Sequence, residues 1–379
     1  MTIMSIRNRL IILLTSLLAL ACDRVPELPS IQLSKDNPLQ FLVVNEGLFT
    51  TNTAALSAVY KDGTIYWDVF EPINQRPLGD VAQSITLING KLFVAINNSR
   101  RIEVLDPTTF KSVASLRYSQ SGSPRYITPL TNNTALVSDL YGQLVKISTT
   151  PPYEVLEYIS LPTASSGIEQ MVTVRNKVFG AYLNRGIAIL DAEKLWIPNM
   201  RLIDGLDIPW ELGGCQLLVD HRQRVWCTSL LPNGVKLSAI DSQSETIVAE
   251  VALSFDRSEP HEGDIIGMPK NNRVDIDPTG QYIYINLYTQ TKEGQPLQTL
   301  FTIDVDSHKV SKYLELPGVN MMYGMNVSPD GDVFICDCLD YSAQRGYIRQ
   351  FPKDGGEVRS YKVGVYPNRI FFPPKGGWQ

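Results

Sequence analysis

The strongest constraint on the fold is a repeated pattern of short apolar runs that begins between Leu78 and Asp106. Three runs rich in Val, Ile, Leu and Phe follow one another there, separated by Asn89-Gly90 and by Asn98-Ser99-Arg100. Runs of this kind, cut by Asn-Gly type turns, are typical of antiparallel strands joined by tight hairpins. A fourth run, FKSVASL, follows a Pro-Thr-Thr turn and completes a four-stranded meander.

The same unit returns along the chain at a spacing of roughly forty residues. Its turns between the first and second strands are rich in Asn, Asp and Gly, which is the chemistry of tight hairpins. A period of this length with four strands per repeat predicts a β-propeller. The first strands of the five further copies read SPRYITPL, IEQMVTV, GCQLLVD, RVDIDP and GMNVSPD.

Strand-like material is left over at both ends of the chain. The C-terminus carries YPNRIFF, and the N-terminus carries FLVVNE, ALSAVYKD and TIYWDVF. Together these segments predict one more blade, closed by strands from both termini, which removes the free sheet edges that invite aggregation. The predicted fold is therefore all-β, a seven-bladed β-propeller over residues 40–379. An open array or a six-bladed ring would leave one chain end without partners.

The first residues are predicted to be a lipoprotein signal peptide, residues 1–21. Arg7 and Arg9 precede the apolar run LIILLTSLLALA, which is too short to span a bilayer as a helix. Ala21-Cys22 resembles the bacterial lipobox, although Ala19 stands where Leu is usual. The resemblance implies cleavage before Cys22 and lipid on that residue. The alternative is an ordinary secretory signal with an incidental Cys. Residues 22–39 are polar and contain Pro, so they are predicted to be a flexible tether.

The other cysteines form two pairs. Cys215 and Cys227 flank a predicted hairpin, which makes a disulfide between them possible in an exported protein. Two buried free thiols are the alternative. Cys336 and Cys338 are expected to pack rather than bond. Neither pair has metal-ligand spacing and the three His are scattered, so no metal site is predicted.

Composition and motifs exclude several classes of function. The formal net charge of -5 shows none of the basic surplus that marks nucleic-acid binding. The chain has no nucleophile elbow, phosphate loop or H-E-x-x-H motif. We therefore predict a binding protein with no catalytic residues, not an enzyme.

In a propeller, the loops that lead into the innermost strands share one face with the loops between the second and third strands. That face surrounds the central channel, and here it is rich in Arg, Tyr, Asn and Asp. Tyr and Trp supply contact area and Arg and Asn supply directional donors, which suits a large polar ligand. The alternative is that these residues only form turns and line an ordinary loop surface. The candidate ligand-binding residues are Asn45, Glu46, Asp80, Gln83, Asn97, Asn98, Arg100, Arg125, Tyr126, Asp139, Tyr141, Gln170, Asn184, Arg185, Trp210, Arg273, Tyr288, Tyr323, Asp340, Tyr341, Asn368 and Arg369.

Three further expectations concern the same face. Residues 255–272 and 288–299 are predicted to be long loops, with His261 exposed in the first. Asp80, Asp139 and Asp340 could hold Ca²⁺ as oxygen ligands, but they are interleaved with Arg, so local ion pairing is predicted instead.

The segments LGDVAQS, INGKLFVAINNSRRIEVLD, SPRYI and DYSAQRGYIRQF, with GVYPNRIFF at the end, resemble the surface lipoprotein propellers of Bacteroides-type bacteria. This family has YVTN-like repeats and includes cobalamin-binding lipoproteins that sit over TonB-dependent vitamin B12 transporters. The resemblance covers residues 40 to 372. It implies an outer-membrane, lipid-anchored, cell-surface protein that captures a corrinoid and passes it to such a transporter.

The corrinoid would be cargo and not a cofactor, because the D-x-H-x-x-G signature of cobalamin-dependent enzymes is absent. Its amides would take Asn, Gln and backbone partners, its phosphodiester would take Arg, and Tyr or Trp would lie against the corrin edge. The alternatives are a surface glycan-binding propeller and a metal-assisted lactonase or lyase. The last of these would need Asp, Glu or Asn clustered on the channel axis.

Overall fold

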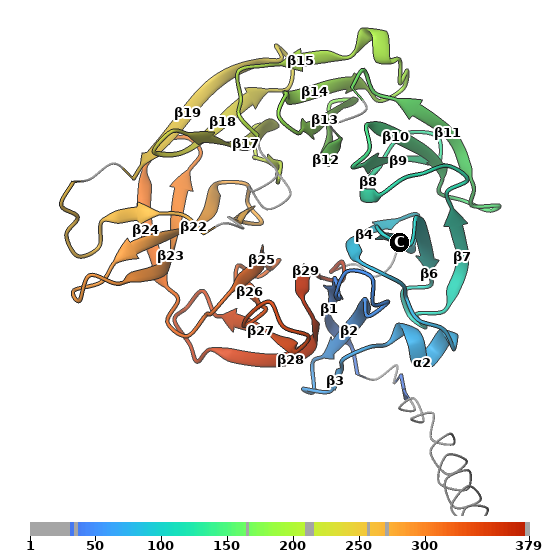
Figure 1. Cartoon of the computed structure of the whole chain (residues 1–379), viewed down its shortest axis with the longest axis horizontal. Coiled ribbons are helices and arrows are strands. Elements are labelled where there is room, and N and C mark those ends of the chain that lie inside the picture. Colours follow the sequence, from blue (N-terminus) through green and yellow to red (C-terminus); the bar gives the residue numbers. More distant parts are fainter. Residues whose placement is uncertain are drawn as a thin grey trace, which may run out of the picture. The chain divides into compact units, whose positions relative to one another are not determined.

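The computed structural model describes residues 31–33, 37–163, 167–208, 216–255, 258–269 and 273–375. They form seven antiparallel sheets arranged as blades around a central channel, which confirms the predicted seven-bladed β-propeller (Figure 1). The predicted signal peptide, Cys22 and most of the predicted tether lie outside the described residues. No helix in the described ranges is long and apolar enough to cross a membrane.

Blades 1 to 6 are meanders that run from the channel outward. Blade 1 contains β4 (Ala82–Ile88), β5 (Lys91–Ile96), β6 (Arg101–Leu105) and β7 (Ser112–Arg117); blade 2 contains β8 (Pro124–Pro129), β9 (Thr134–Asp139), β10 (Gln143–Ser148) and β11 (Val155–Ser160); blade 3 contains β12 (Ile168–Val174), β13 (Lys177–Tyr182), β14 (Gly186–Asp191) and β15 (Arg201–Ile203), with a short 3-10 helix, η1 (Ile197–Asn199), before β15.

The second half of the ring follows the same plan. Blade 4 contains β16 (Leu218–Val219), β17 (Arg224–Leu231), β18 (Gly234–Asp241) and β19 (Thr246–Ser254); blade 5 contains β21 (Val274–Ile276), β22 (Tyr282–Gln290), β23 (Pro296–Asp304) and β24 (Val310–Glu315), with β20 (Ile265–Gly267) added to β22; blade 6 contains β25 (Met322–Val327), β26 (Val333–Asp337), β27 (Arg345–Phe351) and β28 (Arg359–Val365).

The seventh blade joins the two ends of the chain. Its innermost strand is β29 (Pro367–Phe371), and it continues with β1 (Leu39–Asn45), β2 (Ala55–Tyr60) and β3 (Ile65–Tyr66). In the register, Val43 faces Ile370 across the seam, which places the two terminal strands side by side (Figure 1). The predicted closure by strands from both termini is therefore confirmed.

The burial of each strand depends on its place in the blade. Middle strands lie between neighbouring blades and are buried on both faces, as in β5, where every residue after Lys91 is buried. Outermost strands face solvent on one side, so β19 buries Val251 and Leu253 and exposes the residues between and beside them. This is why the inner runs read as continuous apolar stretches and only the outer runs alternate.

Four blades share one turn between the third and fourth strands. In blade 1, Asp106 Oδ1 accepts hydrogen bonds from the backbone N–H groups of Thr108 and Thr109. Asp191, Asp241 and Asp304 accept the equivalent pairs in blades 3, 4 and 5. An Asp side chain that satisfies two backbone donors fixes a tight turn, and thereby the register of the outermost strand.

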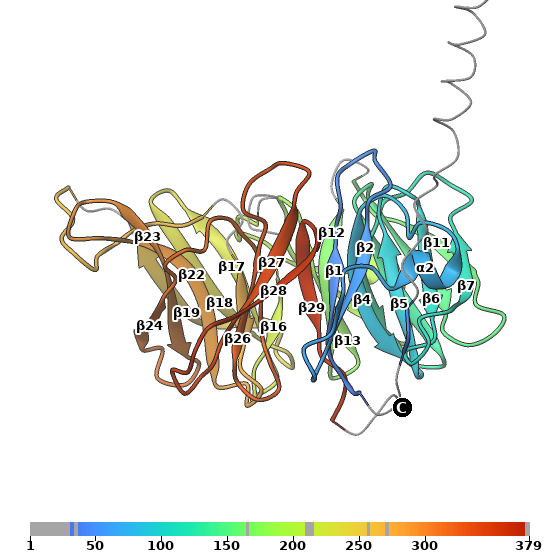
Figure 2. The same ribbon diagram turned by 90° about the horizontal axis from the view of Figure 1, so that it is seen from below.

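Two segments differ from the sequence-based expectation. The predicted loop 288–299 is mostly strand, because β22 and β23 pair over their whole length from Tyr282–Asp304 to Gln290–Pro296. The predicted loop 255–272 contains β20, which pairs with the far end of β22. This hairpin extends beyond the rest of the ring (Figures 1 and 2). A short helix, α2 (Phe70–Asn74), was also not predicted, and it lies between β3 and β4.

The described cysteines are buried and unbonded. Cys227 carries a free thiol, as do Cys336 and Cys338, whose expected packing is confirmed. The pairing of Leu218 with Trp226 shows that Leu217, and not Cys215, continues the register opposite Cys227. Cys215 lies outside the described residues, so for Cys227 the structure corresponds to the free-thiol alternative.

Candidate functional site

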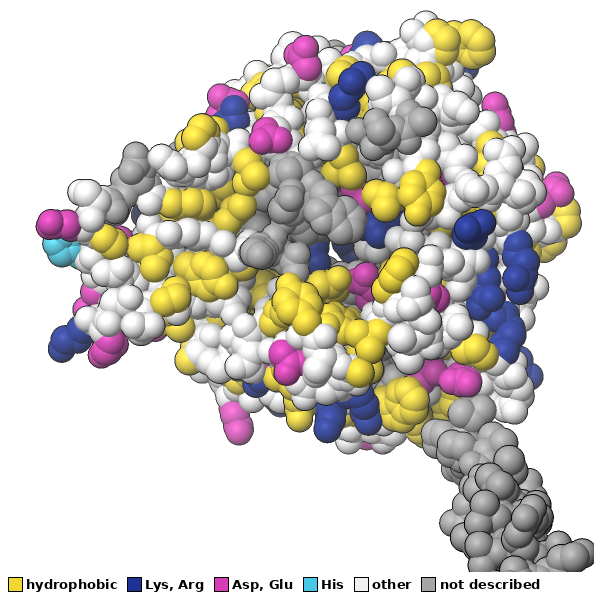
Figure 3. All heavy atoms as spheres, in the orientation of Figure 1, with side chains coloured by type: hydrophobic (Ala, Val, Ile, Leu, Met, Phe, Trp, Pro, Cys, Tyr) yellow, Lys and Arg dark blue, Asp and Glu magenta, His cyan; other side chains and the backbone are white. Residues whose placement is uncertain are grey.

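The innermost strands bring polar side chains together at one end of the central channel. This end opens on the face that carries the loops into the innermost strands, which is the upper face in Figure 2. Figure 3 views the same face directly and shows acidic and basic side chains next to one another close to its middle. At least one side chain comes from each blade; the channel ring, as we call it, consists of Glu46, Gln83, Arg125, Glu169, Gln216, Arg273, Tyr323, Asn368 and Arg369.

The best-defined part of the channel ring is a buried ion pair. Arg125 Nε lies 3.0 Å from Glu169 Oε1, and both side chains are buried, at 7% and 1% exposed. Arg125 Nη1 also donates to Gln83 Oε1 at 2.5 Å. Burial raises the pKa of the Glu169 carboxyl, and Arg125 acts against that rise. The pair ties the innermost strands of blades 1, 2 and 3 together.

A second group forms around Glu46 in blade 7. Burial raises the pKa of Glu46, and Arg125, a hydrogen bond from the Tyr323 hydroxyl and Arg273 oppose the rise. Arg273 Nε donates to the Tyr323 carbonyl oxygen at 2.6 Å, and the Arg273 guanidinium lies 5.5 Å from the centre of the Tyr323 ring. Burial also raises the pKa of Tyr323, so its hydroxyl stays protonated and donates.

Blade 7 supplies a third arginine. The guanidinium of Arg369 lies 5.4 Å from the centre of the Tyr126 ring, a cation–π contact that crosses from blade 7 to blade 2. The neighbouring Asn368 Nδ2 approaches the Gln83 carbonyl oxygen at 3.5 Å. Burial raises the pKa of Asp275, which accepts hydrogen bonds from the Val327 and Ile276 backbone N–H groups.

Tyrosine side chains lead from this ring toward solvent. The ring of Tyr323 lies edge-on to Tyr366 with 5.6 Å between centres, and Tyr366 lies 6.4 Å from Tyr341. Tyr341 is 68% exposed at the tip of the loop between β26 and β27, whereas Tyr366 is buried. An aromatic wall therefore runs from the polar ring to the rim of the channel.

The structure brings together part of the predicted set. Glu46, Gln83, Arg125, Tyr126, Arg273, Tyr323, Asn368 and Arg369 all take part in the contacts described above.

Another part of the predicted set stabilises loops and strands. Asn45 is fully buried and donates to the Val43 and Ala55 carbonyl oxygens. Asn97 Oδ1 accepts from the Ser123 hydroxyl at 2.5 Å, and Asn98 donates to Asp80. Asn97 and Asn98 therefore correspond to the turn-forming alternative, whereas Asn45 is a buried residue of strand β1.

Among the described residues, none of the three loop aspartates forms the predicted ion pair. Asp80 accepts from the Thr50 backbone N–H, Asp139 accepts from the N–H groups of Ser123 and Tyr141, and Asp340 accepts from Ser342 and Gln344. Neutral donors bind all three carboxylates, although Asp80 Oδ1 is buried without a hydrogen-bond partner among the described residues.

The remaining predicted residues lie apart from the polar ring. Arg100, Tyr141, Asn184, Arg185 and Asp340 are exposed on loops, and Arg185 stacks on Tyr182. Tyr288 lies within β22 and not in a loop. Gln170 Oε1 accepts from the Leu217 backbone N–H. Trp210 lies outside the described residues. His261 is exposed, as expected.

Four residues of this region were not among the candidates: Glu169, Gln216, Asp275 and Tyr366. Glu169 is the second residue of its innermost strand, as Gln83 and Arg125 are of theirs, so aligning the repeats by strand position would have found it. Gln216 lies two residues before β16. Gln216 Oε1 accepts from the Val274 backbone N–H, so it bridges blades 4 and 5.

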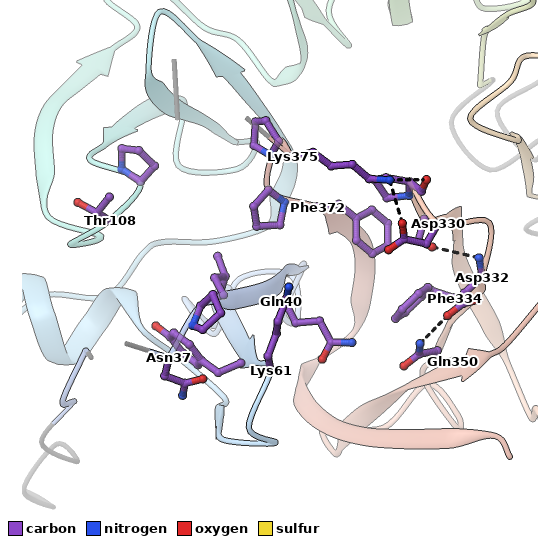
Figure 4. A pocket seen from close by; sticks show the side chains of 18 of the residues that line it. Asn37, Gln40, Lys61, Thr108, Asp330, Asp332, Phe334, Gln350, Phe372 and Lys375 are labelled. Carbon is purple, nitrogen blue, oxygen red and sulfur yellow. Dashed lines mark hydrogen bonds and ion pairs between the residues drawn. The ribbon is translucent and has the colours of Figure 1, made fainter. Parts of the chain in front are cut away.

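A groove of about 1130 Å³ opens on the opposite face of the propeller (Figure 4). It is lined by both ends of the propeller chain, by the first-to-second strand turn of blade 6 and by the third-to-fourth strand turns of blades 7 and 1. Lys375 Nζ pairs with Asp330 there at 2.9 Å, and Gln350 donates to Asp332. Phe334 and Phe372 pack against each other at its floor, with ring centres 5.1 Å apart.

Within the described residues, no group of three His, Cys, Asp or Glu side chains could hold a metal ion. The carboxylates of the channel ring are separated by Arg125, Arg273 and Tyr323, which neutralise or hydrogen-bond them. The arrangement is suited to holding polar groups of a ligand by directed hydrogen bonds.

Comparisons with known proteins support the fold. Residues 40–205 match a family model described as a domain of unknown function, DUF5074. That match begins in β1 and ends after β15, so it covers less than the complete ring. No curated protein matches the chain.

Solved structures with the same architecture have diverse functions. A quinonprotein alcohol dehydrogenase-like protein of Bacteroides thetaiotaomicron is 16% identical with a TM-score of 0.63, over 88% of this chain and 78% of that one. Hydrazine synthase of Kuenenia stuttgartiensis is 15% identical with a TM-score of 0.54, over 76% and 86%. An inactive virginiamycin B lyase of Staphylococcus aureus with quinupristin is 11% identical with a TM-score of 0.50, over 74% and 84%. These likenesses establish the β-propeller fold alone.

Proposed function

We propose that the chain is a non-enzymatic binding protein that captures a large polar small molecule at the mouth of its central channel. The observation that carries this proposal is the channel ring, in which polar side chains from all blades converge beside an aromatic wall. Binding sites commonly combine apolar or aromatic lining with a few fixed polar groups. Here the fixed groups are pre-organised, because Arg125, Glu169 and Gln83 hold one another in place.

The ligand that we propose is cobalamin or a related corrinoid. Its amides match the side-chain amides of Gln83, Gln216 and Asn368, and its extended ring edge matches the exposed Tyr341 and its neighbour Tyr366. The resemblance to corrinoid-binding surface lipoproteins supports the same ligand. On this proposal, the chain is lipid-anchored at Cys22 on the outer membrane and delivers the corrinoid to a TonB-dependent transporter.

The test is isothermal titration of the full chain in detergent with cyanocobalamin. We expect one-to-one binding below micromolar concentration, weakened at least about tenfold in Tyr341→Ala by loss of aromatic contact area. Tyr282→Ala is the matched control, because Tyr282 is an exposed tyrosine (44%) at the start of β22, away from the channel ring. Absence of binding by the wild-type chain contradicts the corrinoid proposal. Binding in a glycan screen, or lactone turnover abolished by EDTA, would then support one of the alternatives.

A further inference from the structure

Three neighbouring loops present exposed side chains on the face that surrounds the channel mouth. Blade 7 presents Phe49 between β1 and β2, and blade 2 presents Tyr141 between β9 and β10; these residues are 68% and 58% exposed. The equivalent loop of blade 1, which lies between them in the ring, presents the exposed Arg100. We call Phe49, Arg100 and Tyr141 the rim residues.

Hydrogen bonds hold the loops of blades 7 and 1 together. Asp80 Oδ2 accepts from the Thr50 backbone N–H at 2.9 Å and from the side-chain amide of Asn98. The Asp80 backbone N–H donates to Ser99 Oγ at 2.9 Å. Thr50 and Val81, which are both β-branched, have φ angles of 68° and 63°. Because β-branched residues rarely adopt this conformation, the bonding around Asp80, and not local preference, fixes these loops.

A second chain of hydrogen bonds joins the loops of blades 1 and 2. The Ser123 hydroxyl donates to Asn97 Oδ1 at 2.5 Å, and the Ser123 backbone N–H donates to Asp139 Oδ2 at 2.7 Å. The other oxygen of Asp139 accepts from the Tyr141 backbone N–H at 2.8 Å. The three loops are thus connected from Thr50 to Tyr141. Loops that are fixed in advance lose little conformational entropy when a ligand binds to them.

The two aromatic rim residues are isolated from other rings. In the described part of the chain, neither Phe49 nor Tyr141 packs against an aromatic side chain. Figure 3 shows the hydrophobic side chains of this face in separate groups, with polar atoms between them. An apolar protein partner or a lipid bilayer would require a continuous apolar patch. Separate rings suit a saccharide chain, because the C–H bonds of a sugar ring pack on an aromatic face while its hydroxyls take polar partners.

The outer strands of blade 1, next to Arg100, carry an excess of positive charge. Arg101 and Arg117 face each other across β6 and β7, and like charges in that arrangement repel. Arg76 and Arg101 share one carboxylate, that of Glu103, at 2.9 Å and 3.0 Å. Within the described ranges, the Arg117 side chain forms neither an ion pair nor a hydrogen bond. Figure 3 shows Lys and Arg side chains gathered along the edge of the molecule over this blade.

Arg100 connects the aromatic rim residues with this charged edge. Its backbone carbonyl accepts from the Tyr118 N–H at 3.0 Å, so it lies beside the end of β7. Its side chain is exposed and forms no hydrogen bond or ion pair with a described residue. The nearby carboxylates of Asp80 and Asp139 are buried and accept the hydrogen bonds given above. The charge presented to solvent is therefore positive, which suits an anionic ligand.

We propose that the rim residues form a second binding site, which holds an acidic polysaccharide along the edge of the channel mouth. Phe49 and Tyr141 pack against sugar rings, and Arg100 binds a carboxylate or sulfate group between them through its planar guanidinium. The arginines of blade 1 attract the polyanion. The rim residues are distinct from the channel ring and from the wall of Tyr366 and Tyr341, so this inference is independent of the corrinoid proposal.

The test measures binding of the full chain in detergent to immobilised polysaccharides. Polygalacturonate carries carboxylates, dextran sulfate carries sulfates, and unmodified dextran is the neutral control. We expect retention on at least one acidic polymer, weakened by added salt because the charges are screened, and none on dextran. Preference for polygalacturonate would identify the group bound by Arg100 as a carboxylate, and preference for dextran sulfate would identify it as a sulfate.

Variants of the rim residues locate the site. The double variant F49A/Y141A is expected to weaken polysaccharide binding by about tenfold or more, because it removes two aromatic faces. Arg100→Glu should weaken binding more than Arg100→Gln, since it replaces attraction by repulsion; loss of a merely structural contact would not produce this order. Trp196→Ala is the matched control, because Trp196 is an exposed aromatic residue (61%) in the turn between β14 and β15 of blade 3.

Several outcomes would overturn the proposal. They are failure of the wild type to bind either acidic polymer, equal retention on dextran, and binding that the rim variants leave unchanged. Binding to phosphatidylglycerol vesicles in place of the polysaccharides would show that the surface responds to charge alone, which also contradicts the proposal. The substituted side chains are exposed, so thermal unfolding of each variant should match that of the wild type.

The rim site and the corrinoid proposal fail separately. The rim variants should leave cyanocobalamin binding unchanged, and Tyr341→Ala should leave polysaccharide binding unchanged. Polysaccharide binding without cyanocobalamin binding keeps the rim site and rejects the corrinoid. Cyanocobalamin binding without polysaccharide binding keeps the corrinoid and rejects the rim site.

Discussion

The buried pair of Arg125 and Glu169 determines whether the channel ring keeps its geometry. Glu169→Gln leaves the Arg125 charge buried without its counter-charge, so we expect the free energy of unfolding to fall by about 3 kcal/mol. Chemical denaturation measures the change. The double variant R125M/E169M removes both charges and should lose much less stability. If the losses of the single variants R125M and E169M simply add in the double variant, the two charges do not stabilise each other.

Asp68 makes the stability of the protein depend on pH. Burial raises its pKa from 3.8 to about 6, and Asp68 is only 5% exposed. The folded state therefore binds the proton more tightly than the unfolded chain, so its contribution to stability falls as pH rises from about 4 to about 6.

Asp68→Asn removes this titration and keeps an oxygen that can accept the Phe70 backbone N–H. We expect the variant to gain stability relative to the wild type between pH 4 and pH 7, by roughly 2–3 kcal/mol in total. Thermal unfolding across this pH range measures the difference. A difference between the two proteins that stays constant with pH would show that Asp68 does not titrate in this range.

Residue identities were easier to predict than residue roles. Asn45 and Glu46 are adjacent in the sequence and both were candidates, but Asn45 is buried against β2 while Glu46 takes part in the channel ring. Asn and Asp serve turns and ligands with the same chemistry, so type alone cannot separate the two roles. The strand register decides them, and the sequence does not specify it to one residue.

At the level of elements, the contact between β25 and β29 depends on Gly324. A Cβ atom on this residue would lie 1.8 Å from the Asn368 carbonyl oxygen, so no side chain fits. We expect Gly324→Ala to push the innermost strands of blades 6 and 7 apart and to destabilise the protein by about 2 kcal/mol or more. Denaturant unfolding checks this. Gly267→Ala is the control, because its Cβ would meet nothing closer than Tyr288 at 4.0 Å. Equal stability of the two variants would contradict the expectation.

Strands could be predicted from the sequence where their burial requires a run of apolar residues. Elements without such a run were missed. The strands between blades carry apolar runs bounded by turn residues, and these were found. The outer half of the β22–β23 hairpin reads TQTKEGQPLQT, and its pairing relies on backbone hydrogen bonds between polar residues. Helix α2 has five residues, too few to show helical periodicity.

The ring as a whole depends on the seam in blade 7. Deleting the residues from Pro367 onward removes β29, exposes the inner edge of β1 and deletes Asn368 and Arg369 from the channel ring. We expect the truncated chain to lose its cooperative unfolding transition and to aggregate, because the free edge has no covering strand. Calorimetry and size-exclusion chromatography measure both effects. A chain that ends at Lys375 is the control and should behave like the wild type. Retention of a single cooperative transition in the shorter chain would show that the seam is not required.

The number of blades was predictable because the repeats can be counted in the sequence. Six complete repeats with complementary fragments at the two ends allow only one closed ring. The chemistry at the centre was less accessible, because it depends on which side chain of each innermost strand points inward at the same height.

The seam also sets a time scale for the synthesis of this protein. Next to the seam, Gly364 in β28 donates a backbone hydrogen bond to Ser57 Oγ in β2, 307 residues earlier in the chain, so strands made early and late in synthesis meet here. At roughly 5–20 residues per second, β1 waits on the order of tens of seconds for β29. During that interval the nascent chain carries an unpaired strand edge. Its yield in the cell should therefore depend on how well chaperones shield that edge until the last strand arrives.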